Sequence, residues 1–286
     1  MSATILNGKE LAQKLRNEMK KEVSQLKNEG LIPHLTVVLV GNHPASKSYV
    51  SGKEKAADEV GIASKIINLP EETSEEELLK TIGELNRDPS VHGILIQLPL
   101  PNHISEYRII EAINPQKDVD GFHPLNIGRM MTNQDTLLPC TPYGILTMLN
   151  AENIKIEGKH VVIIGRSNIV GKPVGQLLLN ENATVTYCHS KTKNLAEFTL
   201  KADILIVAVG VPNIINADHI KQDAIVIDVG INRTDEGKLT GDVDFDSAKT
   251  KASHITPVPR GVGPMTIAML LKNTIKAAKG LSQYHE

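Results

Sequence analysis

Tyr49 and Lys53 lie four positions apart in a segment of helical composition. On an α-helix this spacing places both side chains on one face, where a phenol and an amine can reach the same bound molecule. A lysine amine that is buried loses proton affinity, so it can act as a base or proton shuttle near neutral pH. The alternative is an aromatic residue on a packing face beside a solvated lysine, because surface lysines are common. The pair indicates acid–base chemistry only in the company of other polar residues.

Three such residues follow along the chain. Gln97 ends the apolar stretch Gly93 to Leu98, and the carboxyl end of a parallel strand faces the ligand crevice of an open α/β sheet. Its amide can both donate and accept. Asp118 and Asp120 lie in a loop, where a carboxylate can accept two N–H bonds from an amino-pyrimidinone edge. The alternatives are a polar strand end and an Asp-Gly turn without function.

A glycine turn follows a second apolar strand, Val161 to Ile164. The turn, Gly165 to Pro173, has the sequence GRSNIVGKP, and a helical pattern comes after it. A strand, a glycine turn and a helix start together form an anion site, because small residues admit a pyrophosphate close to the backbone and free N–H groups face it. The spacing departs from G-x-G-x-x-G, and a glycine turn without a ligand is the alternative.

The residues after the next strand predict which nicotinamide cofactor is used. NAD-binding sheets place an acidic residue about 20 positions beyond the glycine turn, where it binds the ribose 2′-hydroxyl. This chain has His189, Ser190 and Lys191 there, and Arg166 lies in the turn itself. These residues favour a 2′-phosphate, and hence NADP over NAD, unless Arg166 and Lys191 are merely solvated surface charges.

Strand and helix patterns alternate along most of the chain, which predicts parallel sheets. Before residue 99 we expect helices and strands at Gly8–Glu29, Leu35–Val40, Ala45–Val60, Ile62–Leu69, Ser74–Asn86 and Gly93–Leu98. The stretch Pro99–Pro142 is predicted to be mostly loop, with one helix near Ser105–Ile113. A doubly wound series then follows at Tyr143–Asn150, Val161–Ile164, Gly171–Leu179, Thr184–Cys188, Leu195–Lys201, Ile204–Val209 and Ile225–Val229, before a last helix at Met265–Lys279.

Composition excludes several classes of partner. A chain of 286 residues can form two domains, and its net charge of −2 gives no broad attraction to nucleic acid or to anionic membranes. Cys140 and Cys188 are far apart, so we expect neither a disulfide framework nor a metal site, and a reducing cytoplasm fits best. Cys140 is expected to be a buried small residue, not a nucleophile. No signal core and no run of about 18 apolar residues occurs, so we expect no membrane span.

Several segments together resemble a known family, the bifunctional methylenetetrahydrofolate dehydrogenase/methenyltetrahydrofolate cyclohydrolases. They occur in the family's order from the first helix to the last, which makes the set far more specific than any one segment. The segments are YVSGK at 49–53, QLPLP at 97–101, KDVDGF at 117–122, PCTP at 139–142, GRSNIVGKP at 165–173 and GVGPMT at 261–266.

The resemblance implies a fold and an activity. The fold is a two-domain α/β protein, with a folate-binding catalytic domain at 1–142 and 265–286 and a Rossmann-type NAD(P)-binding domain at 143–264, the last helix returning to the first domain. The enzyme would oxidise 5,10-methylenetetrahydrofolate with NADP⁺ and hydrolyse the methenyl product to 10-formyltetrahydrofolate, within one-carbon metabolism and purine biosynthesis. Members are usually homodimers paired through the nucleotide domains.

The resemblance also implies roles for individual residues. Lys53 is the residue most needed for hydrolysis, Tyr49 stacks on the folate and Gln97 partners Lys53, while Asp120 holds the pterin ring. Further substrate contacts are expected from Leu98, Pro99 and Pro264. Cofactor contacts are expected from Gly165, Arg166, Ser167, Gly171, Pro173, His189, Ser190, Ile231 and Thr266, with Arg166 and Ser190 at the 2′-phosphate and the loop Gly261–Thr266 near the nicotinamide.

Arg260 departs from the family pattern, which usually has glycine at this position. If the backbone there requires a positive φ, a non-glycine residue costs on the order of 1 kcal/mol. Alternatively, Arg260 adds a charge beside the cofactor.

Two rival functions remain open from the sequence. An NADP-linked dehydrogenase of the shikimate or amino-acid type also places a substrate domain first, but it leaves Asp120 and the segment Pro139–Pro142 without a role. A nucleotide-binding regulator without turnover is the alternative from a different class. Short-chain dehydrogenases also carry Y-x-x-x-K, but after the glycine turn, so that family is disfavoured.

Overall fold

The chain forms two compact units, and the computed structural model describes residues 3–234 and 236–282. As far as they are described, unit 1 comprises Met1–Ala12 and Thr141–Thr266, and unit 2 comprises Gln13–Cys140 and Ile267–Glu286. The chain passes from one unit to the other within α1 (Gly8–Asn28) and α10 (Val262–Ser282), and at the start of α6 (Cys140–Ala151). Over the two described ranges, no helix has both the length and the apolar composition needed to cross a membrane.

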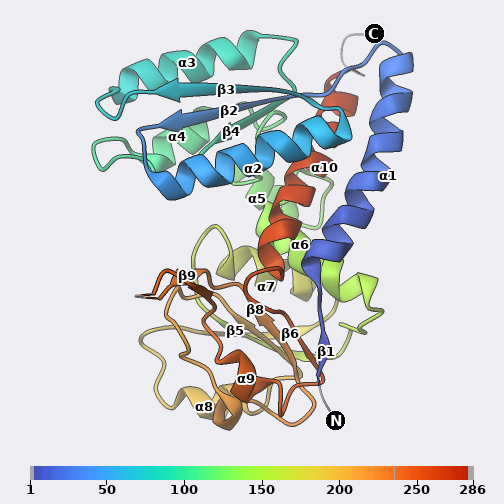
Figure 1. Cartoon of the computed structure of the whole chain (residues 1–286), viewed down its shortest axis with the longest axis vertical. Helices are drawn as coiled ribbons and strands as arrows, with labels where there is room; N and C mark the ends of the chain where they lie inside the picture. The colour runs from blue at the N-terminus through green and yellow to red at the C-terminus, as the bar shows by residue number, and fades with distance from the viewer. Residues whose placement is uncertain (1–2, 235, 283–286) are drawn as a thin grey trace. The chain divides into compact units, whose positions relative to one another are not determined.

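Unit 2 contains a three-stranded parallel sheet, in which β2 lies between β3 and β4 (Figure 1). Its elements are β2 (His34–Val40), α2 (Pro44–Val60), β3 (Ala63–Leu69), α3 (Glu75–Arg87), β4 (Gly93–Ile96), α4 (Glu106–Ala112) and α5 (Pro124–Met131), with parts of α1 and α10. Alternate side chains of a strand face opposite layers. Val38 and Val40 accordingly pack with α3 and α4 in one apolar cluster, while α2 packs against β2 and β3.

Local signals explain where the helices of unit 2 begin and end. A capping box starts α3, because the Ser74 hydroxyl accepts from the Glu77 N–H at 3.2 Å and the Glu77 carboxylate accepts from the Ser74 N–H at 3.0 Å. Ser74 is therefore the N-cap of α3. A proline, Pro44, starts α2, which ends at Gly61 with a φ of 89°.

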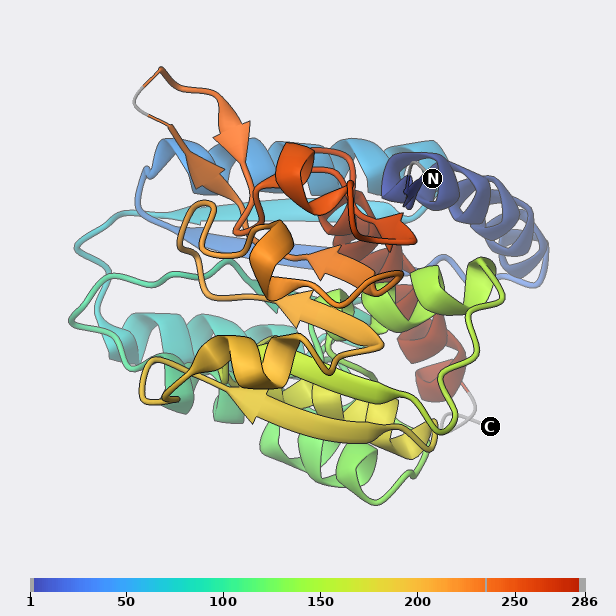
Figure 2. The ribbon, with the colours of Figure 1, turned by 90° about the horizontal axis from the view of Figure 1, so that it is seen from below.

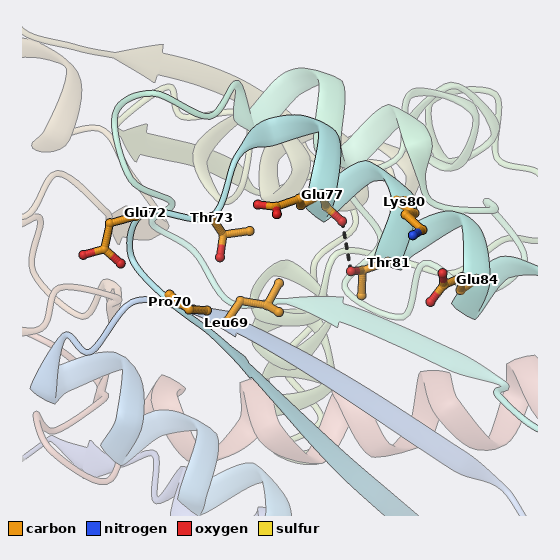
Figure 3. Close-up of a pocket in the computed structure, with 8 residues that line it drawn as sticks. All are labelled: Leu69, Pro70, Glu72, Thr73, Glu77, Lys80, Thr81 and Glu84. Atoms are coloured by element: carbon orange, nitrogen blue, oxygen red, sulfur yellow. Dashed lines mark hydrogen bonds between the residues drawn. The ribbon is translucent and has the colours of Figure 1, made fainter.

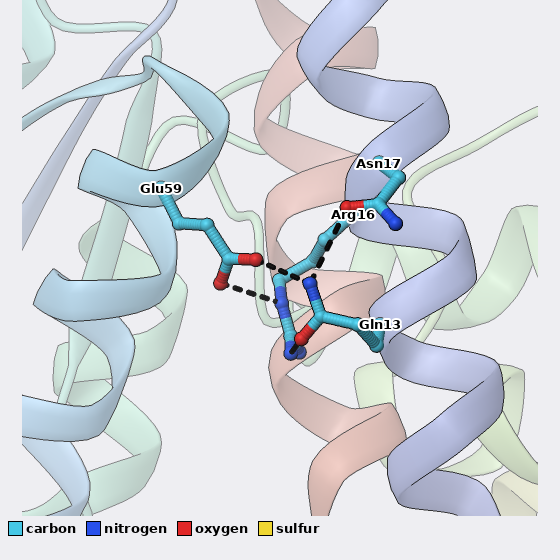
Figure 4. Close-up of polar contacts among 4 residues, drawn as sticks. All are labelled: Gln13, Arg16, Asn17 and Glu59. Carbon is cyan, nitrogen blue, oxygen red and sulfur yellow. Dashed lines mark hydrogen bonds and ion pairs between the residues drawn. The ribbon is translucent and has the colours of Figure 1, made fainter.

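The part of α1 in unit 2 contacts α2 through a polar cluster (Figure 4). Arg16 Nε lies 2.9 Å from Glu59 Oε2, and Gln13 Nε2 donates to Glu59 Oε1 at 2.5 Å. Because Glu59 is exposed, this cluster contributes at most about 1 kcal/mol. The buried Val23 adds an apolar contact, because its Cγ1 lies 3.6 Å from the position of a Cβ on Gly61 at the end of α2.

Unit 1 contains a six-stranded parallel sheet in the order β1-β11-β8-β7-β5-β6. Its elements are β1 (Thr4–Ile5), β5 (His160–Ile164), α7 (Gly171–Asn180), β6 (Thr184–Cys188), α8 (Leu195–Thr199), β7 (Ile204–Val207), the 3₁₀ helix η1 (Ala217–His219), β8 (Ile225–Asp228), β9 (Asn232–Arg233), β10 (Leu239–Thr240), α9 (Phe245–Ala248) and β11 (His254–Ile255), with α6 and parts of α1 and α10. The hairpin of β9 and β10 stands out from this sheet (Figure 2).

The strand order of unit 1 reverses between β5 and β7. The chain leaves β5 for β6 on one side and then returns across β5 to β7 on the opposite side. In open α/β sheets, ligands bind outside the carboxyl ends of the strands at such a reversal. The two-domain α/β fold with a doubly wound nucleotide sheet is thus confirmed, and so is the return of the last helix, since residues 267–282 of α10 belong to unit 2.

One expectation about the fold was wrong. The stretch from Pro99 to Pro142 contains a second helix, α5, which is only two turns long, with Pro124 in its first turn and a cap from the His123 ring. Such a short segment carries too little periodicity to be recognised. Residues 1–12 were expected in the catalytic domain, and this boundary stays a prediction. In the structure Thr4 and Ile5 pair with His254 and Ile255 at the edge of the sheet in unit 1.

Arg260 has a φ of 86°, in the left-handed region. Its carbonyl accepts from the Lys9 N–H at 3.0 Å, so the loop conformation is fixed by contacts within unit 1. The departure from glycine thus falls at a position where an L-residue is strained.

We predict that Arg260→Gly raises the stability of the chain by about 0.5–1 kcal/mol, because the relieved strain exceeds the added entropy of the unfolded glycine. Thermal unfolding midpoints of the two proteins give the measurement. Arg260→Ala is the matched control, since it removes the charge and keeps the strain. An equal gain in both variants would show that the charge, and not the backbone, limits stability.

Candidate active site

Lys53 and Gln97 meet at the carboxyl end of the sheet in unit 2. Lys53 is carried by α2, which follows β2, and Gln97 follows the neighbouring strand β4. The Gln97 N–H donates to the Val38 carbonyl at 2.9 Å, which holds the residue against β2. Lys53 Nζ then donates to Gln97 Oε1 at 2.9 Å, and Gln97 Nε2 donates to the Leu98 carbonyl at 2.7 Å. The structure therefore brings together the two residues expected to act as partners.

Lys53 is only 7% exposed, although a lysine with the usual pKa is charged at neutral pH. Burial lowers the pKa of Lys53, while the nearby Asp120 carboxylate raises it in part. The ammonium form is therefore less favoured than in water, and the neutral amine forms at a lower pH than in an exposed lysine. This is the property required of a proton-transferring lysine.

Asp118 and Asp120 have different surroundings although they are separated by one residue. Asp118 is buried and accepts from the N–H groups of Gly121 at 3.2 Å and His123 at 2.7 Å, and from Asn126 Nδ2 at 2.9 Å. Burial raises its pKa to about 6. Asp118 thus shapes its own loop. Asp120 remains partly exposed, and its carboxylate is the one that can meet a bound molecule.

Cys140 is buried against the same loop, as expected of a small core residue. Its Sγ donates to the Val119 carbonyl at 3.2 Å. Burial and the negative charge of Asp120 raise the pKa of the thiol well above its usual value, so no thiolate nucleophile forms.

Asn273 was missed by the sequence reasoning. From α10 its Nδ2 donates to the Val119 carbonyl at 2.9 Å and to the Leu138 carbonyl at 2.8 Å, so one buried amide joins the acidic loop (residues 117–122) to the segment just before α6. The only signal in the sequence is an asparagine within an apolar helical stripe, which does not identify its partners.

Tyr49 offers an aromatic surface one turn before Lys53 on α2. It is 40% exposed, and partial burial raises the pKa of its phenol, so the ring is neutral. Leu98 and Pro99, at the end of β4, are half-buried and exposed respectively. These residues are suited to a flat, partly apolar ligand, with Lys53 supplying the reactive group.

The glycine turn of unit 1 is closely packed. A Cβ on Gly165, whose φ is 121°, would overlap the Ala208 carbonyl, and a Cβ on Gly171 would overlap the Gly165 carbonyl. The Ser167 hydroxyl accepts from the N–H groups of Val170 and Gly171, each at 3.2 Å, at the start of α7. Only glycine fits these two positions, and the turn presents exposed Arg166 and Ser167 at a helix N-terminus.

The loop after β6 lies beside this turn, because the Gly165 N–H donates to the Cys188 carbonyl at 2.9 Å. His189 folds the loop, its N–H donating to Thr192 Oγ1 at 2.9 Å. Ser190 and Lys191 are exposed at this edge, and no carboxylate stands at positions 189–191. This donor set fits a phosphate on the ribose, as NADP carries.

Ile231, an expected cofactor contact, lies beside the loop Gly261–Thr266, which is expected near the nicotinamide. Ile231 is 47% exposed, and its Cδ1 lies 3.7 Å from the position of a Cβ on Gly263. In the same turn of α10, Thr266 Oγ1 is 2.9 Å from Thr141 Oγ1, and Pro264 is half-buried. Pro173 is buried in the first turn of α7.

Gly175 is a further residue that the sequence reasoning missed. A Cβ there would overlap the Tyr187 ring, so α7 lies against the sheet only because this position is glycine. Close helix–strand packing is the role of the third glycine in dinucleotide-binding turns. The signal was present as a glycine four positions after Gly171.

Two surface cavities of unit 2 lie away from these residues. One, of about 500 Å³, lies beside α3 and contains Glu72, Glu77 and Glu84 (Figure 3). Another, of about 300 Å³, lies between α5 and α10. No predicted site residue lines either cavity. Among the described residues, no group of three His, Cys, Asp or Glu side chains can hold a metal ion.

The fold and the site define a class: a protein with a dinucleotide-binding sheet in one unit and a buried lysine centre in the other. Comparison with known families agrees. A model of the tetrahydrofolate dehydrogenase/cyclohydrolase catalytic domain matches residues 6–120, and a model of the NAD(P)-binding domain of the same family matches residues 139–282. The chain therefore belongs to the tetrahydrofolate dehydrogenase/cyclohydrolase family.

Individual relatives are similar over nearly their whole length. The bifunctional protein FolD of Oceanobacillus iheyensis is 70% identical over 98% of both chains. The crystal structure of the FolD methylenetetrahydrofolate dehydrogenase/cyclohydrolase of Campylobacter jejuni is 52% identical, with a TM-score of 0.96 over 98% of this chain and 99% of that chain. The Trypanosoma brucei enzyme, solved with NADP cofactor and inhibitor, is 37% identical with a TM-score of 0.94 over 98% of both chains.

Shikimate dehydrogenase is similar in fold alone. The Aquifex aeolicus structure has a TM-score of 0.51 and 15% identity, over 87% of this chain and 97% of that chain.

We predict that Gly175→Ala lowers the stability of the chain by about 1–3 kcal/mol, because the new methyl group forces α7 away from Tyr187. The thermal unfolding midpoint measures the effect. Gly83→Ala is the matched control: it is also within a helix, and its Cβ would meet only the Arg87 side chain, at 3.5 Å. The control should gain up to about 1 kcal/mol, and similar behaviour of both variants would contradict the packing role.

Proposed function

We propose that this chain oxidises 5,10-methylenetetrahydrofolate to 5,10-methenyltetrahydrofolate with NADP⁺ and then hydrolyses it to 10-formyltetrahydrofolate. The observation that supports the proposal best is the buried Lys53, held by Gln97 at 2.9 Å beside Asp120 in a chain of this family. The relatives named above as bifunctional FolD proteins support both activities. The shikimate alternative rests on a likeness of fold alone, at 15% identity.

Bound NADP⁺ supplies the acceptor for the hydride that leaves the methylene carbon between two folate nitrogens. The resulting methenyl cation is stabilised by those nitrogens, so this step requires no protein base. The protein must instead hold the reacting rings in a productive geometry. Tyr49 is suited to stack on the folate, and Asp120 to accept N–H bonds from the pterin edge.

Hydrolysis requires proton transfers that the first step does not. Water adds to the methenyl carbon, and both of its protons leave the oxygen as the formyl group forms. One proton is taken up by the folate nitrogen whose bond to that carbon breaks, and the other is released to solvent. Lys53 can carry these protons because burial lowers its pKa. Gln97 orients the amine through its carbonyl oxygen and cannot itself act as an acid or base.

NADP is the proposed cofactor, in preference to NAD. The residues suited to its 2′-phosphate are Arg166 and Ser190, with Ser167 at the start of α7. The NADP complex of the Trypanosoma brucei enzyme supports this choice. The proposed contacts to the pyrophosphate come from Gly165, Gly171 and His189. Those to the nicotinamide come from Ile231 and Thr266.

The proposed assembly is a homodimer through unit 1, acting in the cytoplasm. The edge strand β6 carries Tyr187, which is 40% exposed, and the adjoining end of α7 carries Leu179, which is 51% exposed. Exposed apolar residues beside a free strand edge suit a self-complementary interface. The two cysteines, Cys140 and Cys188, are free and buried, which suits a reducing compartment.

The activity is tested by incubating the chain with methylenetetrahydrofolate and NADP⁺ while following the rise and decay of methenyl absorbance. Lys53→Met should abolish the enzymatic decay and leave NADP⁺ binding nearly intact, because the proton carrier lies in unit 2. Lys55→Met, at an exposed lysine of the same helix, is the matched control and should decay like the unaltered chain. Absence of any absorbance change with folded protein would reject the proposal, and unchanged decay in Lys53→Met would remove Lys53 from this role.

The pH dependence of hydrolysis tests the electrostatic coupling of Lys53 to Asp120. The carboxylate stabilises the ammonium form, so Asp120→Asn should lower the pKa of Lys53 further. The neutral amine would then persist to lower pH, and the acidic limb of kcat for methenyltetrahydrofolate hydrolysis should move to lower pH at saturating substrate. A limb that stays in place or moves to higher pH would contradict the coupling.

A further inference from the structure

Two buried aspartates, Asp228 and Asp242, lie together in unit 1. Asp228 ends β8 and is 4% exposed, while Asp242 follows β10 and is 0% exposed. They are packed so closely that a Cβ on Gly230 would overlap the Asp242 carboxylate, and a Cβ on Gly241 would overlap that of Asp228. The glycines on both sides leave room for the two acids and for nothing larger.

Asp242 connects two loops through its carboxylate. Its Oδ2 accepts from the N–H groups of Val209 at 2.7 Å and Gly210 at 2.9 Å, in the loop after β7. Its Oδ1 accepts from Asn232 Nδ2 at 2.9 Å, in the segment after β8. One side chain therefore sets the positions of the loops that follow two neighbouring strands.

Asp228 holds Asp242 in turn. Its Oδ1 accepts from the N–H groups of Gly230 at 2.9 Å and Asp242 at 3.0 Å, and its Oδ2 accepts from the Val243 N–H at 2.9 Å. All six donors to the two acids are neutral, and carboxylates can only accept. Burial raises the pKa of Asp228 to about 6, which shows that its carboxylate loses solvation in the folded chain. The six hydrogen bonds to the two acids compensate for that loss.

The loops that these acids hold are those nearest to the expected cofactor. The loop after β7 touches the glycine turn at the reversal of strand order, where a Cβ on Gly165 would overlap the Ala208 carbonyl. The segment after β8 carries the exposed Ile231, which lies beside Gly263. In this fold, the ligand crevice is formed by the loops at such a reversal.

We propose that Asp242, supported by Asp228, is a positioning residue for the nicotinamide cofactor, fixing the loops after β7 and β8 so that they form one wall of its site. The inference rests on the proposed function for the identity of the ligand. Asp242 itself is buried beneath the loops, so it acts through them.

The test measures the Kd of NADP⁺ for the full chain by calorimetry, together with methenyltetrahydrofolate hydrolysis without cofactor. Asp242→Ala should weaken NADP⁺ binding at least tenfold and leave hydrolysis unchanged, because Lys53 belongs to unit 2. Asp242→Asn should stay within about threefold of the unaltered chain, since its carbonyl can accept from Val209 and Gly210 while the Asn232 amide turns its oxygen to the new NH₂ group. Asn232→Ala, which keeps the buried acids, should weaken binding several-fold.

Asp244→Ala is the matched control. Asp244 is a carboxylate two positions further on, and it caps α9 by accepting from the Ser247 N–H at 3.1 Å. The substitution should lower the thermal midpoint and leave the Kd of NADP⁺ unchanged.

Three results would overturn the inference alone: NADP⁺ binding by Asp242→Ala as tight as by the unaltered chain, equal losses in Asp242→Asn and Asp242→Ala, or an equal loss in Asp244→Ala. Failure of the unaltered chain to bind NADP⁺ would instead overturn the proposed function.

Discussion

Burying an ammonium group is unfavourable unless neighbouring groups compensate, and the architecture of unit 2 meets this requirement for Lys53. The helix after β2 supplies the lysine, the end of β4 supplies the Gln97 oxygen, and the acidic loop supplies the negative charge of Asp120. Compensation is partial, because burial still dominates the pKa of Lys53. An amine whose pKa is lowered by burial and partly restored by a nearby carboxylate can gain and lose a proton during turnover.

Unit 1 also has a parallel sheet, but the loops of this sheet are suited to a dinucleotide. A dinucleotide needs close backbone approach and N–H donors, and Gly165, Gly171 and the start of α7 provide both. Acidic side chains are consequently placed below the loops, as with Asp242, where they accept N–H bonds without facing phosphate. Asp120 of unit 2 thus stays partly exposed beside a lysine, whereas Asp242 of unit 1 is fully enclosed and accepts from loop N–H groups.

Much of this organisation could be predicted from the sequence because it depends on local patterns. Apolar periodicity located the strands that carry Gln97 and the glycine turn, and the rule for parallel sheets placed both at carboxyl ends. The segments around Lys53 and Arg166 then indicated the family. What could not be predicted depends on contacts between distant residues, such as Asn273 with Val119, or on a helix as short as α5. The role of Asp118 within its own loop also required the structure, because its hydrogen-bond partners cannot be identified from the sequence.

The contact of Asn273 with the acidic loop has a consequence for how the protein is made. Its amide bonds the Val119 carbonyl across 154 positions of sequence, and it also bonds the Leu138 carbonyl. During synthesis the strands of unit 2 leave the ribosome long before this asparagine does, and chains are extended at roughly 5–20 residues per second. At this rate the loop that carries Asp120 precedes Asn273 by about 8–30 seconds, so the chain cannot complete the hydrogen bonds of its catalytic centre until α10 has been made.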